Sequence, residues 1–336
     1  MSRAAILLLS IGTALFVALL AWQGFGSVTG TLAVAGWGLA LVAAFHVVPL
    51  ALDAGAIAVL FRKGERLDQR HALLARWSGE AVNSLLPAGQ IGGPVAMVRQ
   101  LAQRGMAMRD AAAAITVSTT LQAVAQIVFA VFGIALFSAY AANGAPRDLG
   151  LAAAIATLVL GAMIALFYVA QRRGLFGRLL RVAQKLFAKR DWSALATRAD
   201  AIDASVKSLY QERGRAAASF VLSLAGWLAG TAEVWLALRF LGHPVGWVDA
   251  LLLESIGQAI RGAAFAIPGS LGVQEGGYLL LAPLVGLPPE AALALSLAKR
   301  ARELVLGLPG LLYLHFSERR WQRRRALRVP AVEIAD

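Results

Sequence analysis

Residues 266–278 read AIPGSLGVQEGGY, and this short stretch interrupts a long hydrophobic region. Its proline and glycines break any helix, and a carboxylate, Glu275, lies among them. Backbone groups without a helical partner cannot stay bare in lipid, because the hydrocarbon of a bilayer offers no hydrogen bonds. The stretch must therefore face protein or a polar cavity, and it is typical of the tip of a re-entrant hairpin.

The composition around it is that of an integral membrane protein. Of the 336 residues, 59% are hydrophobic and 15% are charged, and the mean hydropathy is +0.67. Residues 4–22, 111–146 and 149–171 contain no charged side chain, and each run is long enough to cross a bilayer. We interpret residues 4–22 as a retained first helix rather than a signal peptide, because no small-residue cleavage pattern follows them.

Several classes of chemistry are excluded or disfavoured. The absence of cysteine excludes disulfides, zinc thiolates and cysteine nucleophiles. The four histidines lack the spacing of motifs such as HExxH, so we expect neither a metal nor another cofactor. Phosphate-binding GxxxxGK[ST] and dual-carboxylate headgroup-enzyme motifs are also missing, so we expect no enzymatic activity.

The net charge of +13 has a membrane explanation. Residues 172–215 hold eleven Lys and Arg against four acids, and residues 318–328 hold six Arg against one acid. Basic segments beside membrane spans are typical of cytoplasmic loops, and they also suit a surface of anionic lipid. Together with Arg3, they predict a bacterial inner-membrane protein with both termini in the cytoplasm, and they argue against nucleic acid as a partner.

The order of segments predicts an all-α polytopic membrane protein with about six spanning helices and two re-entrant helical hairpins. After residues 4–22, the expected spans are 33–61, 110–139, 149–170, 216–241 and 288–316. Two segments are too broken to span: hairpin 1 (about 72–98) begins and ends at the cytoplasmic face, and hairpin 2 (about 250–286) at the opposite face. Their tips contain Pro87, Gly89, Gly92, Gly93, Pro268, Gly269 and Gly272.

These segments form a single transmembrane domain, residues 1–317, followed by a basic cytoplasmic tail, 318–336. A basic cytoplasmic loop, 171–215, interrupts the domain. Within this loop, residues 175–187 have the spacing of an amphipathic helix that lies on the inner membrane surface, although a solvated loop helix fits nearly as well.

The two hairpins resemble each other, which indicates an internal repeat. A charged residue precedes each tip proline by seven positions: Glu80 in hairpin 1 and Arg261 in hairpin 2. An acidic residue opens the next helix in both, 23 residues after Pro87 and 22 residues after Pro268. Because the copies enter from opposite sides, they predict the inverted repeat of broken helices that is common in transporters.

Charged residues gather in the second copy. Glu254, Gln258 and Arg261 share one helix face, and the final span carries KRARE at 299–303. A charge near the middle of a spanning helix costs about 2.5–3.5 kcal/mol. Mutual pairing, Lys299 with Glu303 and Arg261 with Glu254 or Glu275, is one explanation. Cations nevertheless outnumber acids four to three in this set, which favours an anionic headgroup as the ligand.

The first copy and the spans contribute weaker candidates. Glu80 and Arg76 are four residues apart and predict either a polar lining or an ion pair. A proline kink, with Asp53 near the inner face, is our preferred interpretation of the second span. Glu233 is a weak candidate, and Arg239 is expected to point outward. The predicted translocation residues are Arg261, Glu275, Glu254, Gln258, Gln274, Lys299, Arg300, Arg302, Glu303, Asn83, Gln90, Glu80 and Arg99.

Two segments resemble a known family: VNSLLPAGQIGGPVAMVRQL (82–101) and AFAIPGSLGVQEGGYLLLAPLVGLPPEAALALSLAKRARELVLGLPGLL (264–312). They are similar to the flippase-like transmembrane family of lysylphosphatidylglycerol synthase, in its hopanoid-biosynthesis-associated branch. The resemblance implies an inner-membrane protein that moves or places a lipid. Pro94 and the run Ser118–Thr120 stand where such proteins usually carry acids. The soluble aminoacyl-transferase domain is absent from this sequence, so lysyl transfer is not expected.

The sequence thus predicts a flippase for a polar or anionic lipid, whether hopanoid-related, aminoacylated or glycosylated. Arg261, Arg300 and Arg302 would hold the headgroup, and Glu275 or Glu254 would couple its movement to protons. A scaffold for lipid-synthesis enzymes is the second hypothesis, and a lipid headgroup enzyme is the third. The scaffold hypothesis explains the basic surface but gives no reason for charged residues at membrane depth.

Overall fold

The computed structural model describes residues 25–61, 67–86, 89–141, 147–186, 193–264 and 270–326, together with positions 18, 21 and 267. Within these ranges the regular elements are helices, as the sequence predicts. The first predicted span, 4–22, lies outside the described residues except for positions 18 and 21, and so do Pro87, Pro268 and Gly269.

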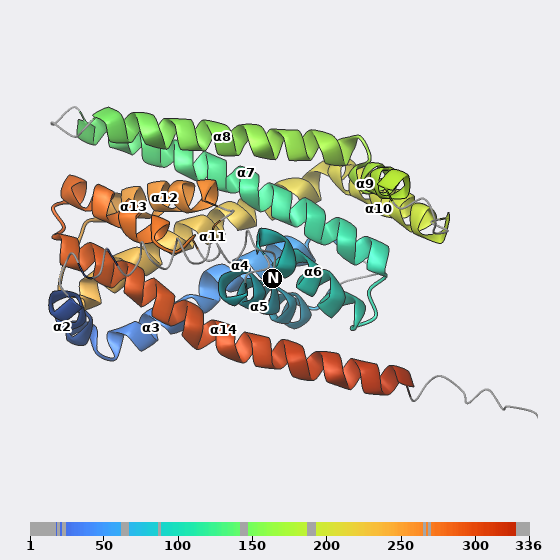
Figure 1. Cartoon of the computed structure of the whole chain (residues 1–336), viewed down its shortest axis with the longest axis horizontal. Helices are drawn as coiled ribbons and strands as arrows, with labels where there is room; N and C mark the ends of the chain where they lie inside the picture. The colour runs from blue at the N-terminus through green and yellow to red at the C-terminus, as the bar shows by residue number, and fades with distance from the viewer. Residues whose placement is uncertain are drawn as a thin grey trace, which may run out of the picture.

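Long helices run along the molecule, and shorter ones fill its middle and ends. In chain order the helices are α2 (Phe25–Ala35), α3 (Gly38–Phe45), α4 (Val47–Ala58), α5 (Gln69–Leu85), α6 (Gly89–Ala102), α7 (Met108–Ala141), α8 (Arg147–Arg172), α9 (Leu175–Leu186), α10 (Ser193–Gln211), α11 (Arg213–Phe240), α12 (Trp247–Ala263), α13 (Val273–Leu281), the 3-10 turn η2 (Ala282–Val285) and α14 (Pro289–Ala326). Figure 1 shows α7 beside α8 along one edge and α14 along the opposite edge, with α9 and α10 at one end and α2 at the other.

Three helical segments in the described part are long and apolar enough to cross a membrane: Gly38–Ala58, Met108–Phe137 and Arg213–Phe240. They coincide with the predicted spans 33–61, 110–139 and 216–241. The basic loop 171–215 contains two helices, α9 and α10. Asp203 of α10 accepts hydrogen bonds from the backbone N–H groups of Phe176 (3.1 Å) and Gly177 (2.9 Å), and so satisfies free N–H groups at the start of α9.

Two helical hairpins, α5–α6 and α12–α13, occupy opposite halves of the molecule (Figure 1). Each comes after a long apolar segment, and each is followed by a long helix, α7 in the first copy and α14 in the second. The sequence repeat therefore corresponds to a structural one. We call Gly38–Ala141 repeat 1 and Arg213–Ala326 repeat 2.

The packing of the helices follows the same two-fold pattern. Within each repeat the helix before the hairpin packs on its first arm, α4 on α5 and α11 on α12. Between the repeats, α7 packs on α12 and α14 packs on α5, while α4 and α11 pack on each other. This exchange of partners is the arrangement expected of an inverted repeat around a central axis.

Local sequence explains where the hairpin arms begin. Asp68 caps α5 by accepting the N–H of Arg70 at 3.1 Å. Gly272 begins α13 with φ +77°, a left-handed conformation that favours glycine, and Glu275 accepts its N–H at 2.7 Å. Glu275 is thus part of the hairpin's construction.

Gly92 and Gly93 lie within α6, so their predicted place at the tip of hairpin 1 is wrong. Gly93 instead allows the two arms to approach closely. A Cβ at this position would lie 2.6 Å from the side chain of Asn83 on α5, whose Oδ1 accepts the N–H of Gly93 at 2.8 Å.

Two helix boundaries differ from the sequence-based expectation. The second span is interrupted at His46, between α3 and α4, rather than at Pro49, which lies inside the first turn of α4. The last helix continues to Ala326, beyond the predicted end of the span at 316, so the basic tail begins as helix.

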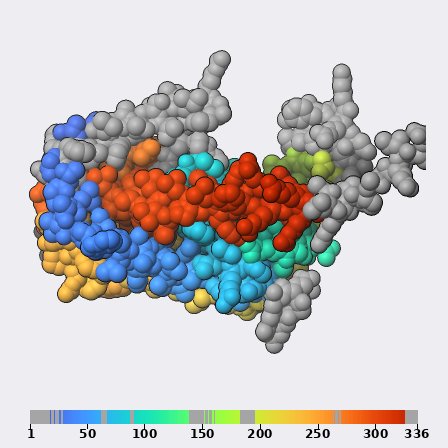
Figure 2. Space-filling view, turned by 90° about the horizontal axis from the view of Figure 1, so that it is seen from below, coloured from blue at the N-terminus to red at the C-terminus, as the bar shows by residue number. Residues whose placement is uncertain are grey.

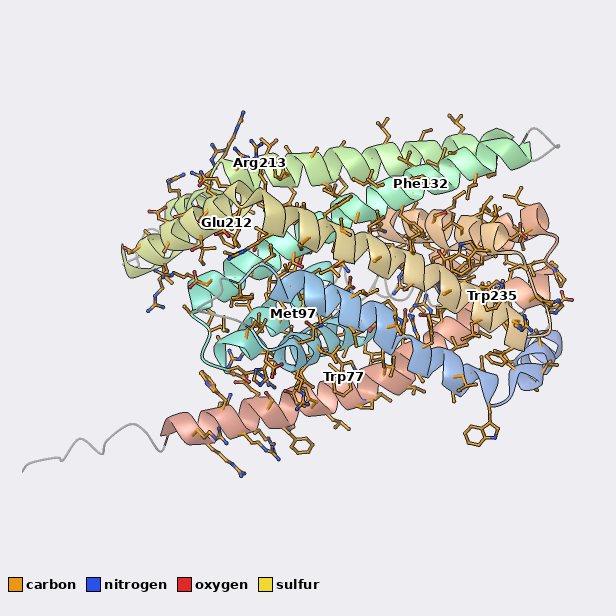
Figure 3. The ribbon with its side chains drawn as sticks, turned by 180° about the vertical axis from the view of Figure 1, so that it is seen from behind. Trp77, Met97, Phe132, Glu212, Arg213 and Trp235 are labelled. Carbon is orange, nitrogen blue, oxygen red and sulfur yellow. The ribbon has the colours of Figure 1, made fainter. Side chains whose placement is uncertain are left out.

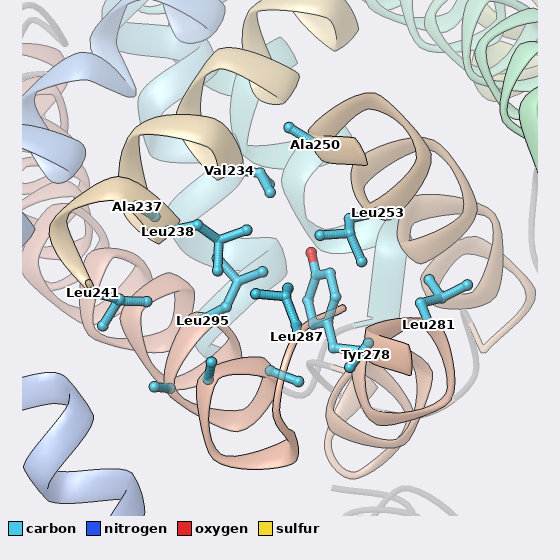
Figure 4. Close-up of a cluster of buried hydrophobic side chains, with 14 of the residues drawn as sticks. Val234, Ala237, Leu238, Leu241, Ala250, Leu253, Tyr278, Leu281, Leu287 and Leu295 are labelled. Atoms are coloured by element: carbon cyan, nitrogen blue, oxygen red, sulfur yellow. The ribbon is translucent and has the colours of Figure 1, made fainter. Parts of the chain in front are cut away.

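Each repeat has its own buried apolar cluster. The larger one joins α11, α12, α13 and α14 around Leu238, Leu253, Tyr278 and Leu295 (Figure 4). The other joins α4, α5, α6 and α7 through residues such as Ile57, Met97 and Ile115. The fold is therefore held by two cores that the two hairpins help to build.

Apolar side chains also cover much of the outside. Figure 2 shows α14 lying across one face of the molecule, flanked by α2–α4 and α5. Its exposed side carries Leu304, Val305, Leu308, Leu312 and Phe316, which are 50–60% exposed. A continuous apolar stripe of this length suits contact with lipid tails. On the other side of α14, Trp77 of α5 donates to the carbonyl of Leu306 at 2.8 Å (Figure 3).

Candidate functional site

A cavity of about 380 Å³ is lined by residues of both hairpins, and many of them are charged or polar. Its walls come from both repeats and from α8. The lining residues are His46, Pro49, Leu50, Asp53, Arg76, Glu80, Asn83, Ser84, Pro94, Met97, Thr119, Gln122, Ala123, Gln126, Ile164, Gly226, Trp227, Gly230, Glu233, Glu254, Gln258, Arg261, Gly262, Arg302 and Glu303. Glu80 and Arg261, which the sequence repeat places in equivalent positions, are both on this wall.

Buried ion pairs organise the wall on the side of repeat 2. Lys299 donates to Glu254, and both side chains are 4% exposed. Arg302 donates to both oxygens of Glu233, at 2.6 and 2.8 Å. The predicted pairing of Lys299 with Glu303 is therefore replaced by Lys299 with Glu254.

Arg261 also has a different partner from those predicted. It donates to Glu303 at 2.8 Å and to the amide oxygen of Gln274 at 3.2 Å, rather than to Glu254 or Glu275. Glu303 receives a further contact from Arg300 at 3.3 Å. This bridge ties the first arm of hairpin 2 to the middle of α14.

Repeat 1 contributes its own charged groups. Arg76 pairs with Asp53 at 2.7 Å, and Gln122 also donates to Asp53 at 2.6 Å. Asp53, which we expected near the inner face, is thus on the cavity wall. Glu80 is held by Nε2 of His46 at 2.8 Å, so the closest partner of Glu80 is His46 rather than the predicted Arg76.

His46 is central to this arrangement. Its Nδ1 lies 2.7 Å from Oε2 of Glu233 and 2.6 Å from Nη1 of Arg302. The imidazole therefore joins carboxylates from α5 and α11. Within the described part of the chain, no set of three or more His, Asp or Glu side chains is arranged to hold a metal ion.

The surplus of positive charge inferred from the sequence disappears in this network. The network comprises six carboxylates, five permanent cations and one imidazole: Asp53, Glu80, Glu233, Glu254, Glu275 and Glu303 with Arg76, Arg261, Lys299, Arg300 and Arg302, and His46. Its formal charge is −1 with a neutral imidazole and zero with a protonated one. The argument for a net anionic ligand consequently loses its basis, because Glu233, Glu80 and Asp53 had not been counted with the cluster.

Four predicted site residues of repeat 2 lie behind the wall: Lys299, which holds the lining residue Glu254, and Gln274, Glu275 and Arg300. Glu275 is fully buried; besides its bond to the N–H of Gly272, it accepts from Ser296 at 2.9 Å and from Arg300 at 3.2 Å. Gln274 donates to the same Ser296 at 2.8 Å. These contacts fix α13 onto α14, so Glu275, Gln274 and Arg300 build hairpin 2 rather than line the cavity.

The predicted residues of repeat 1 divide in the same way. Glu80 and Asn83 line the cavity, whereas the side chain of Gln90 lies outside what the structure describes. Arg99 is half-exposed near the end of α6 and forms a bidentate pair with Glu318 of α14. These hydrogen bonds hold the pKa of Glu318 below its usual range. Arg99 thus belongs to a contact between the repeats that is separate from the cavity.

Sequence reasoning missed several lining residues. Gln122, Gln126 and Trp227 lie in apolar spans and carry no charge, so nothing set them apart. Gln126 donates to the backbone carbonyl of Gln258 at 2.9 Å and so joins α7 to α12. His46 and Asp53 were noticed but interpreted as parts of a proline kink. His46 and Asp53 are seven positions apart, which places them on one helical face, and this spacing could have indicated that both line the same site.

An all-α chain with two repeated helical hairpins beside a cavity lined by charged residues defines a class: polytopic helical membrane proteins with an internal repeat. The comparison with known families is more specific. A family model described as "Lysylphosphatidylglycerol synthase TM region" matches residues 7–310, nearly the whole chain. The protein therefore belongs to this family of multi-pass membrane proteins. No curated protein matches the chain.

Proposed function

We propose that this protein moves the polar headgroup of a membrane lipid between the leaflets of a bacterial inner membrane. The observation that carries the proposal is the cavity itself, which is charged, walled by both hairpins and surrounded by apolar helices. Groups so costly to bury are expected inside a membrane where they bind something polar. The basic helix α9 and the arginines near the end of α14 support cytoplasmic placement of that end and of both termini.

The size of the cavity favours a headgroup over a whole lipid. Its volume of about 380 Å³ is at the lower end of the range for ligand pockets, roughly 300–1,000 Å³. Lipid tails would stay in the bilayer and slide along apolar surfaces such as the exposed stripe of α14. The near-balanced charge of the network favours a zwitterionic or uncharged polar headgroup over a net anionic one.

The chemistry of the wall indicates which polar groups fit. Carboxylates and amide oxygens accept hydrogen bonds from hydroxyl and ammonium groups. Glu254, Gln258 and Gln126 supply such acceptors on one side, and Asn83 and Glu80 supply them on the other. A polyhydroxylated hopanoid and an aminoacylated or glycosylated phospholipid carry suitable donors. This function involves no covalent step, so we propose a transporter and not an enzyme.

The proposal is tested with purified protein in proteoliposomes that contain acyl-labelled fluorescent phosphatidylethanolamine or phosphatidylglycerol. Dithionite bleaches label in the outer leaflet, so further bleaching reports movement from the inner leaflet. We expect faster movement than in empty liposomes, more so for phosphatidylethanolamine. Ala123→Trp, which fills the cavity from α7, should reduce the rate at least tenfold, while Ala217→Trp on the exposed face of α11 should not. Full movement by a folded Ala123→Trp protein would refute the cavity as the path.

A further inference from the structure

His46 receives incompatible hydrogen bonds at one nitrogen. Nδ1 lies within hydrogen-bonding distance of an acceptor, Glu233 Oε2 at 2.7 Å, and of a donor, Arg302 Nη1 at 2.6 Å. A ring nitrogen with a proton can donate but cannot accept, and without a proton it can accept but cannot donate. The two contacts therefore belong to different protonation states of the same imidazole.

Each protonation state accounts for one of the two contacts at Nδ1 and makes the other unfavourable. In the neutral state, Nε2–H donates to Glu80 and Nδ1 accepts from Arg302. In the protonated state, both nitrogens donate, to Glu80 and to Glu233. Proton uptake from water forms one N–H bond, ends the hydrogen bond from Arg302 and adds one positive charge. In both states each ring nitrogen of His46 has a hydrogen-bond partner, so the buried imidazole can be held in either protonation state.

The proton on His46 decides whether the charges of repeat 1 balance, whereas those of repeat 2 balance without it. In repeat 2 the network contains four carboxylates and four cations: Glu233, Glu254, Glu275 and Glu303 with Arg261, Lys299, Arg300 and Arg302. In repeat 1 it contains Asp53 and Glu80 against Arg76. The first set is neutral and the second carries −1, which a protonated His46 cancels.

His46 also contacts both hairpins, one directly and one through neighbours. Glu80 is on the first arm of hairpin 1. On the other side, Arg302 lies 3.9 Å from Glu303, which in turn holds Arg261 of hairpin 2 at 2.8 Å. The charged groups that line the cavity together with His46 are Asp53 of α4, Arg76 and Glu80 of α5, Glu233 of α11, Glu254 and Arg261 of α12, and Arg302 and Glu303 of α14.

We infer that His46 is a proton-binding site whose occupancy shifts the two hairpins relative to each other, so that lipid movement depends on protons. This inference rests on the proposed function. A proton on Nδ1 places two cations, His46 and Arg302, side by side, and their repulsion drives Arg302 toward Glu303. Glu303 is then shared between Arg302 and Arg261, which loosens hairpin 2 from α14. Glu80 meanwhile binds more tightly to His46, which holds hairpin 1 in place.

The proton site and its effect on the hairpins are tested first, without any lipid probe. Protein with isotope-labelled histidine, in nanodiscs, is titrated by NMR from pH 4 to 10. The titrating signal that is missing from the spectrum of His46→Gln identifies His46. Its midpoint should fall by about one pH unit in Glu80→Gln, a tenfold loss of proton affinity, because an opposite charge in contact is removed. A His46 signal that never changes over this range would overturn the inference.

Spin labels report the movement, since the chain has no cysteine of its own. Labels on exposed Leu86, after α5, and exposed Leu280, in α13, measure the distance between the hairpins by pulsed EPR. The distance distribution should differ between pH 5 and pH 9 in the wild type and in His315→Gln, whose imidazole is exposed on α14. It should be independent of pH in His46→Gln. A pH response that survives in a folded His46→Gln protein would overturn the inference.

Lipid movement then separates this inference from the proposed function. In the dithionite assay, the wild type should move phosphatidylethanolamine at least threefold faster when an imposed pH gradient protonates the cavity, and His46→Gln should lose that response. Movement of equal rate at every pH and gradient would refute proton dependence while leaving the lipid transporter intact. If no probe moves at all, the proposed function fails, and the NMR and EPR results still decide whether His46 is a proton switch.

If His46→Gln does not fold, Glu80→Gln replaces it in each measurement and should shift the pH of the response by the same one unit.

Discussion

The buried pair of Lys299 and Glu254 provides a direct test of the charge network. Both side chains are 4% exposed, and they are in contact near the middle of the molecule. Replacing Lys299 with methionine keeps the length of the side chain but leaves Glu254 with Gln258 at 2.9 Å and the Tyr278 hydroxyl at 3.4 Å as its remaining neutral partners. Removing one partner of a buried ion pair costs about 3–5 kcal/mol, because an uncompensated charge stays behind.

We therefore expect Lys299→Met to lower the free energy of unfolding by about 3–5 kcal/mol. The double variant Glu254→Met/Lys299→Met removes both charges, so it should be at least about 2 kcal/mol more stable than the single variant. Unfolding is followed by circular dichroism while sodium dodecyl sulfate is titrated into dodecylmaltoside micelles. The matched control is Lys207→Met on α10, where the lysine is exposed, and its effect should stay within about 0.5 kcal/mol.

Two outcomes would contradict this reasoning. If Lys299→Met loses less than about 1 kcal/mol, Lys299 does not compensate a buried carboxylate. If the double variant is no more stable than the single one, the cost arises from packing of the lysine stem and its contact with the Tyr278 ring, and not from charge.

Three further predictions concern the hairpins. Gly93→Ala should destabilise the protein by about 1–3 kcal/mol in the same unfolding assay, since its Cβ would overlap Asn83, whereas Gly276→Ala, whose Cβ meets nothing within 4 Å, should cost no more than about 0.5 kcal/mol. Glu318→Gln should raise hydrogen exchange near the end of α6 by roughly 1.4- to 5-fold at pH 7, the range for an exposed ion pair. In the wild type, the hydrogen bonds from Arg99 lower the pKa of Glu318, so the stabilisation by this ion pair persists from pH 7 to 5 and is lost only as the pH falls through the lowered pKa. A rise in hydrogen exchange at pH 6, after correction for the intrinsic pH dependence of exchange, would contradict this. Single cysteines at Arg70 and Trp247, which are exposed at the starts of the two hairpins, should react with an impermeant maleimide from the cytoplasmic and the external side, respectively; labelling from the same side would exclude the inverted repeat in the membrane.

The architecture could be predicted because its causes are local. Pro87 and Pro268, with the glycines beside them, interrupt hydrophobic sequence and so indicate the two hairpins. The Arg-rich segments predict which end faces the cytoplasm, and the maleimide labelling tests that prediction. The spacing from each proline to the next acidic helix start revealed the repeat. Each of these patterns involves residues close together in the sequence, so a single sequence was enough to predict the hairpins and the repeat.

The partners within the site could not be predicted in the same way. Arg302 pairs with Glu233, which is 69 positions away, and His46 reaches Glu233 across 187 positions. Lys299 and Arg300 are adjacent in sequence but point to different carboxylates, Glu254 and Glu275, because successive residues of a helix face different directions. Choosing among several acids requires the rotation of α14 against α11, α12 and α13, and that rotation is set by tertiary packing.

The division of the ion pairs between the repeats constrains how the protein can move. In repeat 2 they join α14 to α11 through Glu233, to α12 through Arg261 and Glu254, and to α13 through Glu275. Breaking the pair of Lys299 with Glu254 or of Arg300 with Glu275 would strand a buried charge, so α14 is expected to keep these two contacts, while the contacts of Arg302 and Arg261 are the adjustable ones. Repeat 1 is tied to repeat 2 by His46 within the cavity, by Arg99 and Glu318 near the end of α14, and by Gln126 and Trp77, whose side chains donate to backbone carbonyls of α12 and α14. The His46 contact changes with a proton in the mechanism proposed above, and Arg99 is half-exposed to water, so under the proposed function the boundary between the repeats is where we expect the rearrangement that passes a headgroup.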